Sequence, residues 1–221
     1  MAKLIFYMDF EYDLYIYKKW NLRKFFGEKG LDYFLKQSYP KLVGKTDEEI
    51  ISYFKENQGL ITHQTEKAGT KLKQKWNKTH NQFFKEVERV TGFKWKHKVY
   101  KCHLSSTFIC GGCYDAGKET LISVFPRLPN YLLLDTVFHE LAHLHFWDTI
   151  DKLKIKYPKN EKLTAKGKLW DLSEIAVNYP LQKIKIKGYQ PVFNIYPKHE
   201  ELWRKIKKYW DLSFKDFILK S

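Results

Sequence analysis

The chain has 221 residues, of which 43% are apolar and 17% aromatic, a composition that excludes an intrinsically disordered protein. This length suits one compact domain, or one domain with a smaller companion. Lysine and arginine number 40 against 25 carboxylates, a formal charge of +15. Such an excess is typical either of a lysine-rich soluble surface or of affinity for nucleic acid, anionic membranes or acidic substrates. Because the lysines are scattered along helical stretches, we favour the soluble surface.

Three features of the sequence bear on where the protein acts. No apolar run reaches the length of a membrane span. The N-terminal stretch MAKLIFYMDFEYDLY has acidic residues directly after a short apolar segment and no small-residue cleavage site, unlike a signal peptide. The three cysteines are an odd number, which argues against the disulfide framework of a secreted protein. We therefore expect a cytoplasmic protein.

The first 95 residues are predicted to be mostly helical. A short strand over 3–8 precedes a helix over 11–36, which is broken near Gly27. Further on, Thr46 to Glu49 form a capping box that begins the next helix. Apolar residues at helical spacing predict another helix over 65–91.

The spacing of the apolar residues then changes, and residues 94–125 are typical of short strands joined by turns. A strongly apolar helix is predicted from Tyr131 to about Trp147, and a second helix over 166–179. Pro197 begins a last amphipathic helix. These patterns predict an α+β fold. They divide the chain into a helical region over 1–95, a core over 96–180 and a C-terminal linker and helix over 181–221.

The stretch VFHELAHLHFWD, residues 137–148, contains the pattern H-E-x-x-H. A spacing of four places His139 and His143 one turn apart on the same helix face, where two imidazoles can bind one Zn²⁺ and Glu140 stands beside the metal. Eight of the thirteen positions 132–144 are apolar and surround the two histidines and the glutamate, so these polar groups would be buried and need partners. A chance match on an exposed helix would lack such surroundings, and we therefore predict a metal site.

The stretch GKLWDLSEIAVNYP, residues 167–180, supplies a candidate third ligand. Glu174 lies on the predicted apolar helix, and Asn178 lies one turn later on the same face. With the H-E-x-x-H helix upstream, the arrangement resembles the gluzincin type of zincin metallopeptidase, over about 80 residues. The small size is similar to the minigluzincins, compact relatives that can be held latent by their own C-terminal segment.

This resemblance implies a zincin-like fold: a small mixed sheet with an active-site helix and a glutamate helix. It also implies a zinc-dependent peptidase for peptide or protein substrates, in which Glu174 is the third metal ligand and Glu140 the general base. Asn178 would steady a ligand histidine. An edge strand, formed by residues 110–115 or by residues 121–125, would line the cleft. We favour the first, because its glycines let a backbone approach closely.

Alternatives for the third ligand remain open. Asp171 is the runner-up, because some zincins use an aspartate, and Glu174 would then pair with a lysine. His145 follows His143 by two residues and points to another helix face. The metzincin extension fails, because Phe146 and Thr149 stand where a glycine and a third histidine are needed.

Two further sets of residues carry weaker hypotheses. Cys110 and Cys113, with Cys102 or His103, have the spacing of a second, structural zinc site, although buried thiols often simply pack. A donor to the oxyanion is also needed, and the sequence does not choose among its candidates. These candidates are Tyr179, Tyr189, Tyr196 and His199.

Three other functions stay open beside the active peptidase. The first is a latent enzyme, with residues 181–221 over the cleft. The second is a zinc-stabilised interaction protein without activity. The third is a nucleic-acid-binding module that uses the positive charge of the chain. Aromatic and basic residues interleave in KWKHKVYK, residues 94–101, and in LWRKIKKYW, residues 202–210. The first stretch has the composition to bind single strands by stacking and charge, although rings in the core and solvated lysines explain it as well.

Overall fold

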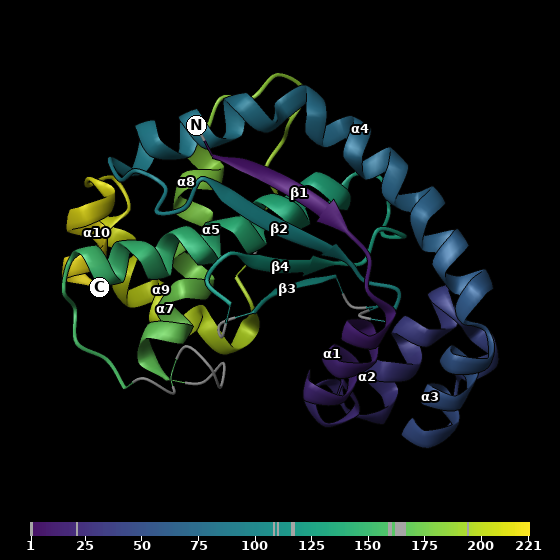
Figure 1. The fold of residues 1–221 in the computed structure, drawn as a ribbon. Coiled ribbons are helices and arrows are strands. Elements are labelled where there is room, and N and C mark those ends of the chain that lie inside the picture. Colours follow the sequence, from purple (N-terminus) through teal and green to yellow (C-terminus); the bar gives the residue numbers. More distant parts are fainter. Residues whose placement is uncertain are drawn as a thin grey trace.

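A computed structural model describes residues 2–20, 22–107, 109, 111–115, 118–158, 161, 167–193 and 195–221. It confirms an α+β fold with a small mixed sheet. The helices lie around one four-stranded sheet, with the long helix α4 arching along the outer side of the molecule (Figure 1). Among the described residues, no helix combines the length and the apolar character needed to cross a membrane.

The sheet has the order β1-β2-β4-β3. Its strands are β1 (Lys3–Tyr7), β2 (Val99–Leu104), β3 (Gly112–Tyr114) and β4 (Leu121–Val124). β1, β2 and β4 are parallel, and β3 runs antiparallel to β4. Of the two predicted edge segments, residues 110–115 contain the edge strand β3, whereas residues 121–125 contain β4, inside the sheet.

One face of the sheet carries the main hydrophobic core. Alternate side chains of the strands face the helices α4 (Gln58–Thr91) and α5 (Leu132–Lys152), since successive residues of a strand point to opposite faces. Phe83 of α4 stacks on Phe138 of α5, with ring centroids 4.1 Å apart. α5 is buried around its whole circumference, so polar groups such as Glu140, His143 and Asp148 lie inside the protein.

A second core lies at the N-terminal helices α1 (Phe10–Trp20), α2 (Leu22–Ser38) and α3 (Asp47–Glu56). The capping box of Thr46 and Glu49 is confirmed at the start of α3. The break predicted near Gly27 is confirmed, because Gly27 adopts a non-helical φ of 71°. The predicted range 11–36 is also divided between α1 and α2, which the sequence did not indicate. Cys113 and Phe125 of the sheet region belong to this second core.

Two predicted helix boundaries are also wrong. α4 begins at Gln58 and not near residue 65, because Ile61 and Thr65 extend its buried face toward the N-terminus. The helix predicted over 166–179 is divided into α7 (Lys168–Ala176) and α8 (Asn178–Lys183).

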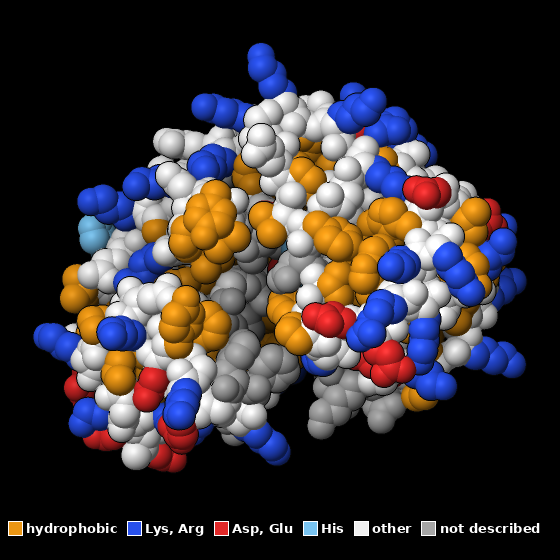
Figure 2. All heavy atoms as spheres, turned by 180° about the vertical axis from the view of Figure 1, so that it is seen from behind, with side chains coloured by type: hydrophobic (Ala, Val, Ile, Leu, Met, Phe, Trp, Pro, Cys, Tyr) orange, Lys and Arg blue, Asp and Glu red, His pale blue; other side chains and the backbone are white. Residues whose placement is uncertain are grey.

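The C-terminal region is part of the main core. It contains a 3-10 turn (Pro197–His199), α9 (Glu200–Ile206), a second 3-10 turn (Lys207–Tyr209) and α10 (Phe214–Lys220). Phe214, Phe217 and Ile218 are buried in the same core as α4 and α5. Figure 2 shows the face turned away in Figure 1, where a hollow is flanked by hydrophobic side chains.

Candidate metal centre

Helices α5 and α7 bring the three predicted ligand side chains together. His139 and His143 lie one turn apart on α5, and Glu174 projects from α7, which packs against α5. One possible ligand atom from each residue lies within 4.8 Å of the other two. Among the described residues, this is the one group of three or more His, Cys, Asp or Glu side chains that could hold a metal ion.

The distances fit a tetrahedral ion. Nε2 of His143 lies 3.1 Å from Nε2 of His139 and 3.6 Å from Oε1 of Glu174. Zinc–nitrogen distances of roughly 2.0–2.1 Å give a tetrahedron with edges of about 3.3 Å, so both separations are close to ligand–ligand edges. Nδ1 of His143 is buried and has no hydrogen-bond partner among the described residues.

Burial keeps both imidazoles neutral. It lowers the pKa of His139 to about 4. Burial, with a further contribution from the charge of His139, also lowers the pKa of His143 well below its ordinary value. Neutral imidazole is the form that binds a metal, so neither ring has to lose a proton from an imidazolium before it can act as a ligand near pH 7.

The two carboxyl groups are buried as well. Burial and then the charge of Glu174 raise the pKa of Glu140 well above its ordinary value. Burial raises the pKa of Glu174 to about 7, against the opposing effect of the positive charge of Lys198. Two buried carboxylates without a cation are costly, and a divalent ion between α5 and α7 would offset that cost.

The edge strand β3 lies directly against Glu140. A Cβ atom at Gly112 would meet Cγ2 of Thr136 at 2.7 Å and Cγ of Glu140 at 2.9 Å. No side chain fits between this strand and α5 at that point. The glycine therefore places the backbone of the sheet edge beside the proposed general base.

We expect Gly112→Ala to lower the free energy of unfolding by about 1–3 kcal/mol, because the added methyl group must displace Glu140 or part the strand from α5. Chemical denaturation measures this change. The matched control is Gly59→Ala in α4, where a Cβ meets nothing within 4 Å. The control should change stability by no more than about 1 kcal/mol. Equal effects in the two variants would contradict the close approach.

Tyr114, two residues after Gly112, packs on the metal-site histidine. Its ring is stacked on that of His143, with centroids 4.9 Å apart, and its hydroxyl accepts a hydrogen bond of 3.1 Å from Nε1 of Trp147. This contact restricts the orientation of the His143 ring. Sequence reasoning missed Tyr114, although the two-residue period of a strand places it on the same face as Gly112.

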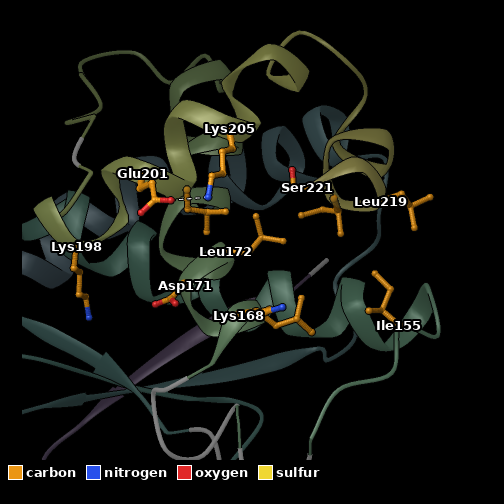
Figure 3. Close-up of a pocket in the computed structure, with 12 residues that line it drawn as sticks. Ile155, Lys168, Asp171, Leu172, Lys198, Glu201, Lys205, Leu219 and Ser221 are labelled. Atoms are coloured by element: carbon orange, nitrogen blue, oxygen red, sulfur yellow. Dashed lines mark hydrogen bonds and ion pairs between the residues drawn. The ribbon is translucent and has the colours of Figure 1, made fainter.

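The other candidates for the third ligand lie elsewhere. Nε2 of His145 is 2.9 Å from the hydroxyl of Thr91, on the side of α5 that faces α4. Asp171 pairs with Nδ1 of His199 at 3.4 Å and lines a pocket of about 560 Å³ between α7, α9 and α10 (Figure 3). Neither residue belongs to the group that contains Glu174.

The contact by which Asn178 would steady a ligand histidine is not formed with Nδ1 of His143. Its amide nitrogen donates to the backbone oxygens of Glu174 at 3.1 Å and Ile175 at 3.4 Å. Because Nδ1 of His143 has no partner among the described residues, Asn178 does not accept a hydrogen bond from it. The side-chain amide of Asn178 instead donates hydrogen bonds to backbone carbonyls in the last turn of α7.

The four candidate oxyanion donors have different surroundings. The hydroxyl of Tyr179 donates to the backbone oxygen of Leu212, away from the metal centre. Tyr189 donates to Oδ1 of Asp135 at 2.8 Å, and its ring packs on Phe138 of α5. His199 is buried and pairs with Asp171, as described above. Tyr196 is 45% exposed and packs against His199.

The pairing of Cys102 with Cys113 in a second zinc site is wrong. Cys102 lies opposite Ile122 of β4, and Ile122 lies opposite Tyr114, so Cys102 shares the α5 face with Tyr114. Cys113 points to the other face, into the second core. His103 on that face is 3.3 Å from Oγ of Ser123 and 3.1 Å from the backbone oxygen of Asp9. Cys110 lies outside the described residues.

We expect Cys102 to be unreactive in the folded protein. It is fully buried, and burial raises the pKa of its thiol far above the ordinary value, so almost no thiolate is present. Iodoacetamide labelling at pH 8, read by peptide mass spectrometry, should leave Cys102 unmodified in the native state. The same thiol should be labelled fully in denaturant. Native labelling at the denatured rate would show that this face of the sheet is open.

In KWKHKVYK, residues 94–101, the aromatic rings pack in the core and lysines form ion pairs at the surface. Trp95 and Tyr100 are buried in the main core, while Lys94 and Lys96 pair with Glu88 and Glu119 at 2.8 and 2.7 Å. These two rings are not available for stacking on bases.

Comparisons of the chain with family models, with curated proteins and with solved structures give no match. The functional interpretation therefore depends on the geometry of this centre and on the sequence pattern that predicted it.

Proposed function

We propose that the protein is a zinc-dependent peptidase. The observation that carries the proposal is the convergence of His139, His143 and Glu174 from two helices, with Glu140 buried next to them and against the edge strand. Two imidazoles, one carboxylate and a fourth position for water are typical of catalytic zinc sites. The nitrogen-rich donor set is less suited to magnesium or calcium, which prefer oxygen ligands.

A zinc ion at this centre would supply a Lewis acid that lowers the pKa of a bound water and polarises the substrate carbonyl. Glu140 would accept the proton of the attacking water, because it follows His139 directly on α5 and is buried beside the edge strand. It would then deliver that proton to the leaving amine. Tyr114 would keep the ring of His143 in its binding orientation.

The edge strand offers a binding site for a peptide substrate beside the proposed metal centre. β3 pairs with β4 on one side, and the other side is an edge among the described strands. An extended peptide can add to such an edge through main-chain hydrogen bonds. Gly112 brings this edge next to Glu140, so a peptide added there would run past the proposed general base.

The test uses protein stripped with a chelator and then loaded with one equivalent of zinc. It is incubated with a peptide library of mixed sequence, and mass spectrometry identifies new termini. Cleavage that requires zinc supports the proposal. Stoichiometric zinc without cleavage of any peptide would contradict it and favour a zinc-stabilised interaction protein. Cleavage that begins only after the C-terminal segment has been cut would indicate a latent enzyme.

A further inference from the structure

The outer face of α4 carries a row of exposed polar side chains, four of which are lysines. Residues 67–85 contain six lysines and no carboxylate, so this stretch supplies +6 of the net +15. At 100° per residue, one set of exposed side chains falls within about 80° of the helix circumference, opposite the buried face. We call this set the lysine row: Lys67, Lys71, Gln74, Lys78, Asn81 and Lys85.

The lysine row contains no carboxylate, unlike several other charged surfaces of the protein. On those surfaces lysines pair with carboxylates, as in Lys45–Glu49, Lys96–Glu119 and Lys205–Glu201. Within the part of the chain that the structure describes, the four lysines of the row have no ion pair and no hydrogen bond. Lys67 and Lys71 stand one turn apart, a spacing at which like charges repel. An anionic partner would remove that repulsion.

The shape of the row suits an extended polyanion. From Lys67 to Lys85 the helix rises about 27 Å, the length of about eight phosphates of one DNA strand at 3.4 Å each. α4 arches along the outer side of the molecule (Figure 1), and every side chain of the row is exposed. The amides of Gln74 and Asn81 between the lysines are typical donors to phosphate and sugar oxygens.

We propose that the lysine row binds the phosphate backbone of a nucleic acid without sequence preference. The row has no exposed aromatic ring or large apolar side chain between its ends, so it lacks both a base-stacking platform and the anchors by which amphipathic helices enter a membrane. Its function is separate from the metal centre, which lies between α5 and α7. The inference does not depend on peptidase activity.

The test is fluorescence anisotropy with labelled single-stranded and duplex DNA of about 20 nucleotides or base pairs, in 50 and 200 mM salt. If four lysines neutralise phosphates, Kd for duplex should rise about 150-fold between these salt concentrations, and Kd for a single strand about 50-fold. The variant Lys67→Gln, Lys71→Gln, Lys78→Gln, Lys85→Gln should raise Kd at 50 mM salt at least about tenfold and flatten the salt dependence.

The matched control removes the same charge elsewhere. Lys29, Lys36, Lys41 and Lys55 on the N-terminal helices are exposed and, within the described residues, unpaired. The quadruple Gln variant at these positions should bind DNA within about threefold of the wild type. Equal weakening by both variants would show a general effect of net charge and overturn the proposal. Absence of DNA binding at 50 mM salt, with or without binding to phosphatidylserine vesicles, would also overturn it.

Discussion

Replacing Glu140 by Gln is expected to lower kcat toward a cleaved peptide by about 10²–10⁴ while one zinc stays bound per chain. Glutamine keeps the size of the buried side chain but cannot accept a proton from water. The proposed metal ligands His139, His143 and Glu174 are untouched, so metal content should equal that of the wild type. Peptide cleavage under saturating substrate and plasma mass spectrometry of the same samples measure the two quantities.

The Glu140→Gln experiment separates catalysis from metal binding. Wild-type kcat in the variant would exclude Glu140 as the general base and refute the mechanism. Loss of both zinc and activity would show that Glu140 supports the fold of α5, where it lies against Gly112. We expect the Glu140→Gln variant to lose turnover alone, with an unchanged thermal unfolding temperature of the zinc-loaded protein.

Replacing Glu174 by Ala is expected to lower zinc affinity at least about 100-fold, because losing a direct ligand should cost no less than losing an outer partner. Glu174 is the one ligand that α7 contributes to the group. Competition with a zinc-binding dye measures the affinity. In the wild type, zinc at 100 times Kd should stabilise the fold by about 2.7 kcal/mol, and in the variant the same zinc concentration should stabilise it by no more than about 0.4 kcal/mol.

Asp171→Ala is the matched control for Glu174→Ala. Asp171 lies on the same helix, one turn earlier, and pairs with His199 rather than with the histidines of α5. Its removal should leave zinc affinity within about threefold of the wild type, since the partners that matter to a metal are its ligands and their direct contacts. If instead Asp171→Ala lost zinc and Glu174→Ala kept it, the third ligand would be reassigned to Asp171.

The parts of the centre that could be predicted are those fixed by local geometry. Helix geometry alone sets the positions of His139, Glu140 and His143 relative to one another, so a four-residue spacing is enough to predict them. Glu174 lies on a separate helix, and its choice over Asp171 came from a resemblance. In the structure, Glu174 joins the two histidines and Asp171 does not.

The contacts that could not be predicted join distant elements. The stacking of Tyr114 on His143 and the approach of Gly112 to Glu140 depend on how β3 lies against α5. No periodicity within either element contains that information. The lysine row was interpreted as scattered charge for a related reason: alternating gaps of three and four residues look irregular in sequence and become one line on a helix surface.

Strand β3 contributes side chains to both hydrophobic cores of the protein. Tyr114 packs in the main core, while Cys113 packs with the N-terminal helices. A shortened chain over 96–180 would keep all four residues of the centre yet lose β1, α4 and the buried rings of α10. The strand beside Glu140 would then have neither of its supports. This architecture therefore offers no short fragment that carries the candidate metal centre with its supports, and engineering of the centre has to keep the flanking regions.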